Sequence, residues 1–300
     1  MNTNNKTFRY HLLAILTVII WGTTFVSTKV LIGNGLTPVE IMLYRFALAY
    51  LGIWFVCPRK LFAQSWKDEL WFVGAGLCGG SLYFVSENTA LGITLASNVS
   101  LIVCTSPILT AFLSRFFNKG EKLPNHLIYG SLMALLGVAL VAFNGSFILQ
   151  INPLGDILTL FAALSWAFYG LILRRLGGRY PTLFITRKVF FYGVITLIPF
   201  LLASSFKPQP EILMQPGVII NLLFLSIVAS LLCFIMWNAS VKELGVVRTT
   251  NYIYMVPLVT LLTSAIAIDE VITVIALFGS VFILSGVYVA EKGFPFLKKR

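Results

Sequence analysis

The chain has 300 residues, of which 58% are hydrophobic and 11% are charged, and its mean hydropathy is +0.90. Soluble domains carry about 25% charged residues, and a soluble fold of this size could not cover so much apolar surface. The excess of 22 Lys and Arg over 11 Asp and Glu would indicate nucleic-acid binding in a soluble chain. Cytoplasmic loops of membrane proteins also collect basic residues, so we predict an integral membrane protein with no nucleic-acid partner.

The apolar residues gather into stretches long enough to cross a bilayer, which takes about 20 mostly apolar residues per helix. In chain order we predict ten spans, at 10–31, 38–57, 69–91, 94–115, 125–144, 153–174, 182–204, 217–240, 247–267 and 270–291. The first stretch is too long for a signal-peptide core, and no small-residue cleavage site follows it. The predicted fold class is therefore an all-α integral membrane protein with ten transmembrane helices.

The basic residues are distributed unevenly between the loops that this count places on the two sides. With the N-terminus in the cytoplasm, 17 of the 22 Lys and Arg fall on the cytoplasmic side and only Lys207 falls on the other. The remaining four, Lys29, Arg45, Arg187 and Lys188, lie inside spans. Because cytoplasmic loops carry the excess of Lys and Arg, we predict a multi-pass protein with both termini cytoplasmic. No Arg- and Ser-rich leader of the transit type is present, and we expect a bacterial cytoplasmic membrane.

A nine-residue pattern occurs twice in the chain. YGSLMALLG at 129–137 and FGSVFILSG at 278–286 share an aromatic residue, Gly-Ser and a second Gly five residues later. Their flanks match as well, and the matched pairs are Trp21 with Trp166, Arg45 with Lys188, Gly76-x-x-x-Gly80 with Ser226-x-x-x-Ser230, and Pro107 with Pro257. The chain therefore holds two copies of one five-helix unit.

The odd number of helices in each copy sets the relation between the copies. A second five-helix unit must enter the membrane from the opposite side, so the predicted domains, 1–148 and 149–300, are inverted repeats. Many secondary transporters are built from inverted repeats, and their substrate sites lie where the repeats meet. We therefore expect a carrier whose small-molecule solute crosses the lipid bilayer between the two halves.

Several segments resemble the drug/metabolite transporter superfamily, and specifically its ten-helix EamA-type members. The first copy carries IIWGTTFVSTKVL, LYRFALAY and TSPILTAFLSRFF, and the second carries LSWAFYGLILRRL and MVPLVTLLTSAIAIDE. The resemblance implies a transporter of small metabolites, often an exporter of amino acids or related compounds. It also implies a cavity between helices 1–4 and 6–9, supported from outside by helices 5 and 10. Many members have an apolar or small residue where Glu87 stands, so coupling residues known elsewhere do not transfer to this chain.

The repeated glycines and prolines have physical roles that the pattern suggests. Glycines at i and i+7 share one helix face and let two backbones approach closely in lipid. The predicted helix-packing residues are Gly130, Gly137, Gly279 and Gly286. Pro107 and Pro257 interrupt the fourth and ninth spans at matched points, where a proline can kink its helix. A gate beside the cavity and a bent scaffold are both compatible with this pattern.

Two ionisable residues inside the spans are the main candidates for function, because a charge in the bilayer must face the protein interior or water. Arg45 either attracts a substrate carboxylate, pairs with Glu87, or caps backbone carbonyls or snorkels to the interface. Glu87 lies four residues before the predicted end of its span, and removal from water favours the neutral form of a carboxyl group. We predict Glu87 as the proton-coupling residue, with a structural pair to Arg45 or a solvated rim position as alternatives.

Aromatic and amide side chains inside the spans supply the remaining candidates. A cavity that takes an amphipathic solute needs apolar walls with a few polar groups, although a lone aromatic in a membrane helix is usually packing or part of the interfacial belt. The predicted substrate-binding residues are Trp21, Arg45, Asn88, Asn98, Trp166, Tyr169, Trp237, Asn251 and Tyr254.

Other classes of function lack their usual residues in this sequence. There is no HExxH, GxSxG or P-loop motif, and we expect no enzyme, no metal site and no cofactor. A channel would need rings of matched polar groups, and a receptor would usually add a soluble output domain. We predict a secondary transporter working by alternating access, with efflux and proton coupling favoured. The alternatives to this function are a facilitative permease, an importer and an intramembrane enzyme. A homodimer is compatible with the sequence as well.

Overall fold

A computed structural model of the chain describes residues 3–58, 62–94, 96–117, 124–143, 152–204, 210–268 and 273–293. Its described secondary structure is entirely helical. Seven helices are long and apolar enough to cross a membrane by length and composition, and Asn125–Val141 is a shorter apolar helix. Helical segments cover all ten predicted spans where the structure describes them, so the prediction of a ten-helix membrane fold is confirmed.

The first half contributes five membrane segments, two of which are composite. They are α1 (Thr3–Gly33), α2 (Pro38–Val56), the continuous run of α3 (Trp66–Gly76), η1 (Leu77–Ser81) and α4 (Leu82–Ile93), the pair α5 (Ala96–Val103) and α6 (Ser106–Phe117), and α7 (Asn125–Phe143). The η1 stretch is π-helical.

The second half repeats this order. Its segments are α8 (Pro153–Gly177), α9 (Thr182–Ala203), the run of α11 (Pro216–Leu223), η2 (Phe224–Leu232) and α12 (Cys233–Leu244), the run of α13 (Val246–Thr250), η3 (Asn251–Met255) and α14 (Val256–Ile268), and α15 (Val274–Lys292). A short helix, α10 (Pro210–Leu213), precedes α11, and the η2 stretch is π-helical like η1.

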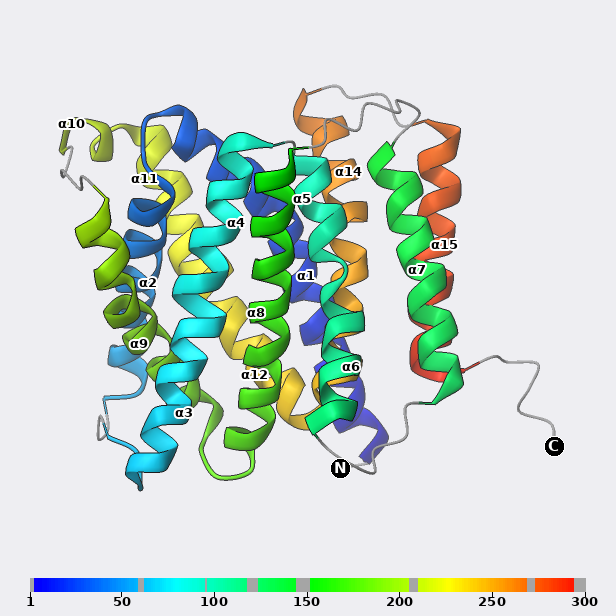
Figure 1. The fold of residues 1–300 in the computed structure, drawn as a ribbon, viewed down its shortest axis with the longest axis horizontal. Helices are drawn as coiled ribbons and strands as arrows, with labels where there is room; N and C mark the ends of the chain where they lie inside the picture. Colours follow the sequence, from blue (N-terminus) through cyan, green and yellow to red (C-terminus); the bar gives the residue numbers. More distant parts are fainter. Residues whose placement is uncertain are drawn as a thin grey trace.

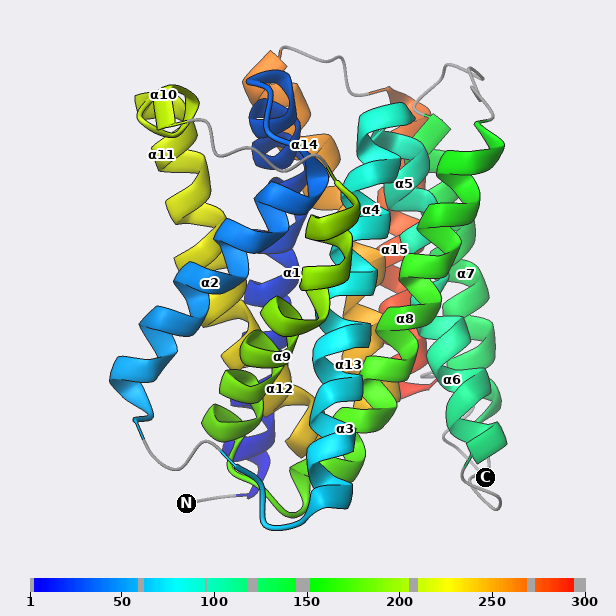
Figure 2. The same ribbon diagram turned by 60° about the vertical axis from the view of Figure 1, so that its left-hand side comes forward.

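Matching helices of the two halves run in opposite directions. In Figure 1, α1 starts at the lower face of the bundle and α8 starts at the upper face. Because α15 ends at the lower face, we call this face the terminal face and the other the opposite face. The halves interlock, since α2 packs on α9, α1 on α12 and α4 on α8, and Figure 2 shows α2 and α9 crossing at one side of the bundle. The inverted architecture expected from the repeat is therefore present.

The prolines predicted to interrupt the fourth and ninth spans lie just after the interruption. Pro107 is the second residue of α6, and Pro257 is the second residue of α14. A proline in the first turn of a helix loses no helical hydrogen bond, because the N–H it lacks would have no partner there. A gating role for Pro107 and Pro257 stays a prediction. The chain breaks before the proline, after α5 and at the 3-10 stretch η3.

The predicted helix-packing glycines lie between α7 and α15, which run side by side at one end of the bundle (Figure 1). A Cβ added at Gly130 would lie 2.3 Å from the backbone nitrogen of Ala290, and one at Gly286 would lie 2.4 Å from that of Ala134. Gly137 and Gly279 each face the carbonyl oxygen of the other, at 2.6 and 2.7 Å from the added Cβ. The two backbones are thus in direct contact at four positions that admit no side chain.

Candidate functional site

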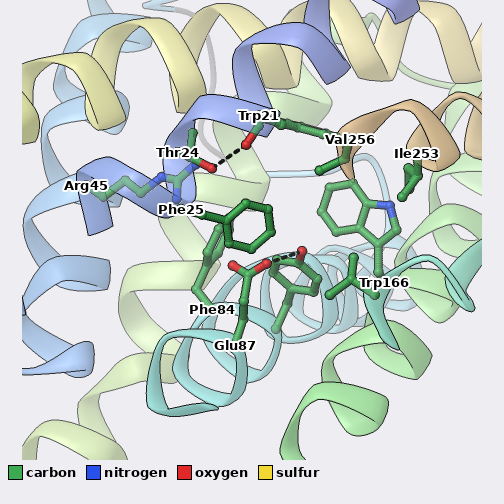
Figure 3. A pocket seen from close by; sticks show the side chains of 11 residues that line it. Trp21, Thr24, Phe25, Arg45, Phe84, Glu87, Trp166, Ile253 and Val256 are labelled. Carbon is green, nitrogen blue, oxygen red and sulfur yellow. Dashed lines mark hydrogen bonds between the residues drawn. The ribbon is translucent and has the colours of Figure 1, made fainter. Parts of the chain in front are cut away.

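A small cavity lies between the two halves, with a volume of about 40 Å³. Its walls carry five aromatic side chains, one cation, one acid and the hydroxyls of Thr24 and Tyr83, besides aliphatic side chains (Figure 3). The lining residues are Trp21, Thr24 and Phe25 of α1, Arg45 of α2, Tyr83, Phe84 and Glu87 of α4, Val103 of α5, Trp166 of α8, Ile253 of η3 and Val256 of α14. An apolar cavity with a few convergent polar groups is the usual form of a small-molecule site.

Arg45 reaches the cavity from the second turn of α2, whose start is held by a capping box. The Thr37 hydroxyl accepts the Glu40 N–H, and the Glu40 carboxylate accepts the Thr37 N–H at 2.8 Å. Arg45 lies seven residues after Pro38, and its side chain is 2% exposed. Its Nε donates to the Ser230 hydroxyl at 2.5 Å. Capping at residue 37 therefore sets where along α2 this cation enters the bundle.

The Arg45 guanidinium also lies over an aromatic ring. Its central carbon is 4.3 Å from the centroid of the Phe84 ring, which is close enough for an attractive cation–π contact. The ring and the Ser230 hydroxyl together replace part of the water that a guanidinium would have outside the membrane.

Glu87 lines the same cavity from α4, one helical turn after Tyr83. The Tyr83 hydroxyl donates to Glu87 Oε1 at 2.7 Å, and the carboxylate side chain is buried. Among the described ion pairs within 4.0 Å, none joins Glu87 to Arg45. The acid and the cation therefore share a cavity without neutralising each other by direct contact.

Trp21 and Trp166, which occupy matched positions in the two halves, meet at the cavity wall. Their ring centroids are 5.3 Å apart, and the ring planes are nearly perpendicular at 84°. The Trp21 indole N–H donates to the Ala229 carbonyl at 3.0 Å, so it has the polar partner that a buried indole requires.

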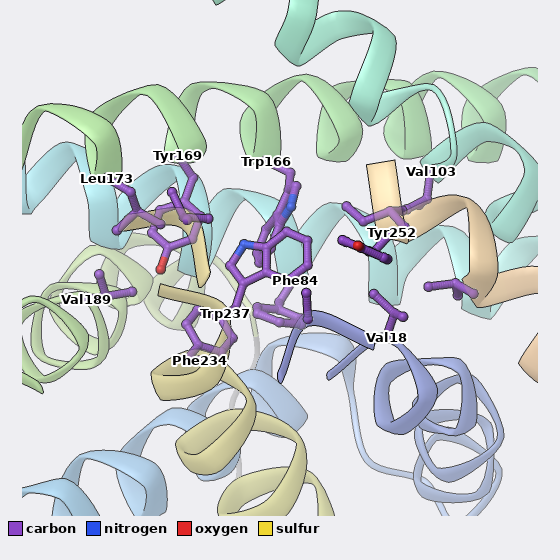
Figure 4. Close-up of a cluster of buried hydrophobic side chains, with 14 of the residues drawn as sticks. Val18, Phe84, Val103, Trp166, Tyr169, Leu173, Val189, Phe234, Trp237 and Tyr252 are labelled. Carbon is purple, nitrogen blue, oxygen red and sulfur yellow. The ribbon is translucent and has the colours of Figure 1, made fainter. Parts of the chain in front are cut away.

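Two other predicted binding residues, Trp237 and Tyr169, pack behind this wall instead of lining the cavity. Trp237 is 1% exposed and lies 4.9 Å from the Trp21 ring, and both residues belong to the large buried cluster in Figure 4. The Tyr169 hydroxyl donates to Asn238 Oδ1 at 2.8 Å, and the Asn238 amide donates to the Thr186 hydroxyl at 2.9 Å. These side chains support the cavity from the side of the terminal face.

The remaining predicted residues are placed elsewhere. The Asn88 amide nitrogen donates to the Pro38 carbonyl at 3.4 Å and faces the start of α2. Asn251 and Tyr254 are buried in η3 without lining the cavity. The Asn98 side chain lies outside the described residues. The structure thus brings Trp21, Arg45, Trp166 and Glu87 of the predicted set to one cavity.

Sequence reasoning missed several residues of this site. Tyr83 and Phe84 were not singled out, although Tyr83 lies four residues before Glu87 and therefore on the same helix face. That spacing was a usable signal. Ser230 entered only as a small residue of the Ser226-x-x-x-Ser230 pair, and no sequence signal connects it to Arg45, which lies 185 positions away.

The residue matched to Arg45 in the second half, Lys188, does not line the cavity. It is 1% exposed, and its ammonium group binds the Glu69 carboxylate near the start of α3. The Tyr192 hydroxyl donates to the same oxygen of Glu69, and the Ala63 N–H donates to the other oxygen at 2.8 Å. Lys188 is therefore a structural cation that joins α9 to α3.

A helical membrane bundle of two inverted halves, with a cavity between them that carries a few polar groups, is the construction of a membrane transporter. The model of the EamA-like transporter family matches residues 8–143 and again residues 153–291. The chain therefore belongs to the EamA-like transporter family, and its function is that of a transporter and not of an enzyme.

Known proteins similar to this chain span almost its whole length. An "Uncharacterized transporter" of Archaeoglobus fulgidus is 30% identical, over 95% of this chain and 97% of that protein. A "Probable amino-acid metabolite efflux pump" of Escherichia coli is 26% identical, over 95% and 96%. A solved crystal structure, 19% identical, superposes with a TM-score of 0.74 over 94% of this chain and 96% of that one, which shows a shared fold.

Proposed function

We propose that this protein exports a small, amphipathic, amino-acid-like solute across the cytoplasmic membrane by alternating access, with proton coupling through Glu87. The observation that carries the proposal is the cavity itself, where Arg45, Glu87 and the facing rings of Trp21 and Trp166 meet between the two halves. A guanidinium suits a carboxylate, a carboxylate suits an ammonium group, and the aromatic walls suit an apolar side chain. The name of the Escherichia coli relative supports the same solute class.

The size of the cavity supports a mechanism in which the halves rearrange around the solute. A volume of about 40 Å³ holds about three water molecules, which is too little space for an amino acid. A solute must therefore enter a wider form of the site. We propose the repeats 1–148 and 149–300 as the units whose exchange of conformation opens the cavity to one face and then to the other.

Glu87 supports coupling to protons because of its place in the cavity. A buried carboxyl group without an ion pair gains from carrying a proton, whereas one exposed to water releases it. In this proposal, Glu87 takes up a proton when the cavity is open to the outside and releases it when the cavity is open to the cytoplasm. The solute moves in the opposite direction, from the cytoplasm to the outside. Its ammonium group competes with the proton for the Glu87 carboxylate, so the solute binds where the proton is released and leaves where the proton is taken up.

The test uses the whole protein in liposomes with a defined internal pH. We expect wild-type protein to drive uphill movement of L-phenylalanine when a proton gradient of opposite direction is imposed. Glu87→Gln should still exchange labelled for unlabelled L-phenylalanine, with a weaker apparent affinity because the ammonium group loses its counter-charge, but it should lose the response to the gradient. Glu211→Gln, at an acid of the short surface helix α10, serves as the control and should behave as wild type.

Two outcomes would contradict parts of this proposal. Downhill flux that ignores the pH gradient in the wild type would indicate a facilitative permease and remove the coupling role of Glu87. Accumulation in the reverse direction under the same gradient would indicate an importer.

The proposed orientation places both termini in the cytoplasm. The unequal distribution of Lys and Arg between the predicted loops supports it. Single cysteines at positions 35 and 178, on a background without the four native cysteines, should differ in labelling by an impermeant maleimide added to intact cells. Labelling at 35 alone is expected, and labelling at 178 alone would reverse the orientation.

A further inference from the structure

Two neighbouring residues of η2 hold two side chains of the cavity, although neither of them lines it. The Ser230 hydroxyl accepts a hydrogen bond from Arg45 Nε at 2.5 Å, and the Ala229 carbonyl accepts one from the Trp21 indole nitrogen at 3.0 Å. Ser230 and Ala229 are fully buried. Because Arg45 and Trp21 belong to the first half and η2 to the second, both bonds cross between the repeats.

The π-helical geometry of η2 allows its backbone to take part. In an α-helix the Cys233 N–H would bond the Ala229 carbonyl, four residues earlier. Here the Cys233 N–H bonds the carbonyls of Val228 and Ser230 instead. The Ala229 carbonyl therefore accepts no hydrogen bond from the Cys233 N–H, and it accepts the one that the Trp21 indole N–H donates. π-helical stretches inside α-helices occur frequently at functional sites, and here the irregular turn provides an acceptor for the cavity wall.

The contact with Ser230 leaves the end of the guanidinium available. Nε, on one edge of the group, is bound to the hydroxyl, while the central carbon of the group lies over the Phe84 ring, 4.3 Å from its centroid. Within the described part of the chain, no hydrogen bond engages the two terminal nitrogens of Arg45. These nitrogens form the fork that binds a carboxylate through two parallel hydrogen bonds.

The first half shows what happens at the same place without a serine. The residue matched to Ser230 is Gly80, which has no hydroxyl, and the cation matched to Arg45 is Lys188. Lys188 is bound to Glu69 and does not reach the cavity. Among the described residues, a single cation therefore lines the cavity, and it is the one that faces a hydroxyl on the π-helical turn.

We infer that Ser230 is a positioning residue, which orients the Arg45 guanidinium so that its terminal nitrogens bind the carboxylate of the solute. This inference rests on the proposed function, in which Arg45 contacts the solute. It adds that the serine at position 230, against the glycine at position 80, determines which of the two repeat-related cations serves the cavity. A structural role in helix packing alone would not affect how the protein discriminates a carboxylate from its amide.

The test compares binding of L-phenylalanine with binding of L-phenylalaninamide, whose carboxylate is replaced by a neutral amide. Binding to the purified full-length protein is followed by intrinsic tryptophan fluorescence, since Trp21 and Trp166 line the cavity. In Ser230→Ala we expect L-phenylalanine to bind about tenfold more weakly while L-phenylalaninamide binds almost unchanged. The loss corresponds to one hydrogen bond to a charged group. Ser230→Thr keeps the hydroxyl and should keep the preference for the carboxylate.

Ser226→Ala is the matched control. Ser226 is also a buried serine of η2, but its hydroxyl donates to the Leu222 carbonyl of its own helix at 2.6 Å. This variant should retain the preference of the wild type. Equal weakening of both ligands in Ser230→Ala, or no change in either, would overturn the inference.

Arg45→Gln separates this inference from the proposed function. If Arg45→Gln loses the preference for the carboxylate and Ser230→Ala keeps it, the positioning role of Ser230 is wrong and the proposed function stands. If wild-type protein binds L-phenylalanine no better than its amide, or binds neither, the proposed carboxylate contact of Arg45 fails and the inference fails with it.

Discussion

Each half of the molecule carries a buried cation at the matched position, and one cation faces the cavity while the other is bound by an acid. Arg45 in the first half faces the cavity, with Ser230 and Phe84 as its neighbours. Lys188 in the second half is bound by Glu69 and lies among aromatic rings. Duplication of a sequence thus produced two equivalent positions, and the residues packed against each one decide whether its charge serves a solute or joins two helices.

Two local differences account for these surroundings. The residue matched to Glu69 is Ile219, so no acid stands where it could bind Arg45 in the same way. The residue matched to Ser230 is Gly80, which offers Lys188 no serine hydroxyl at the equivalent position. Each cation therefore binds a partner from the other half that has no equivalent at the matched position.

Removing Glu69, the acid that binds Lys188, should have the largest effect, and that effect is on stability. Glu69→Ala leaves Lys188 buried without a counter-charge, and breaking a buried pair in this way costs about 3–5 kcal/mol. We expect a matching loss of stability in thermal unfolding followed in detergent. The double variant Glu69→Met with Lys188→Met removes both charges and should recover most of the loss. Equal destabilisation by the double variant would show that the charges themselves are not what matters.

A change at the scaffold should reduce stability without affecting either cation. Gly286→Leu places a side chain where an added Cβ already lies 2.4 Å from the backbone nitrogen of Ala134. Overpacking of this kind costs about 1–3 kcal/mol or more, so we expect a lower unfolding temperature. The protein that remains folded should keep the wild-type preference for L-phenylalanine over its amide. A changed preference would mean that α7 and α15 shape the cavity directly.

Replacing Arg45, the cation that lines the cavity, should weaken solute binding more than it lowers the stability of the fold. Arg45→Gln removes the charge from the cavity, and loss of a hydrogen-bonded charge contact costs about 1.5–3 kcal/mol, or about 10–100-fold in affinity. We expect this loss in L-phenylalanine binding, measured by tryptophan fluorescence. Lys188→Gln should leave the preference for the carboxylate intact. Loss of the preference in Lys188→Gln instead would reverse the roles of the two cations.

We expect the smallest effect on solute binding from removing the hydrogen bond between Trp21 and η2. Trp21→Phe keeps an aromatic ring at the cavity wall but removes the N–H that binds the Ala229 carbonyl. A net hydrogen bond contributes about 0.5–1.5 kcal/mol, which is a change of about 2–10-fold in affinity for L-phenylalanine and its amide alike. A much larger effect on the carboxylate alone would mean that Trp21, rather than Ser230, orients Arg45.

The membrane fold was accessible from the sequence because its signals are local and repeated. A helix that crosses lipid must be apolar along its whole length, so ten spans stand out in composition alone. The odd number of spans per copy then requires the inversion. Glycines such as Gly130 and Gly286 could be assigned to helix packing because only a missing side chain lets two backbones touch in lipid.

The irregular turns were not accessible in this way. The Gly-x-x-x-Gly and Ser-x-x-x-Ser pairs mark the two matched stretches, but nothing in them distinguishes a π-helical turn from a continuous α-helix. The hydrogen bonds of the Cys233 N–H to the Val228 and Ser230 carbonyls are seen only in the structure.

Composition and the internal repeat are enough to predict an inverted pair of five-helix units with Arg45, Glu87 and Lys188 inside its spans. The packing of the helices shows which of these charges meet in a cavity, and that Trp237 and Tyr169 lie behind its wall. The physical reason is that lipid and protein interior are equally apolar, so a pattern of hydrophobic residues does not reveal how a helix is rotated about its axis. Leu202 is 83% exposed and Phe190 is fully buried on the same helix, α9, and the rotation that separates them also turns Lys188 towards Glu69.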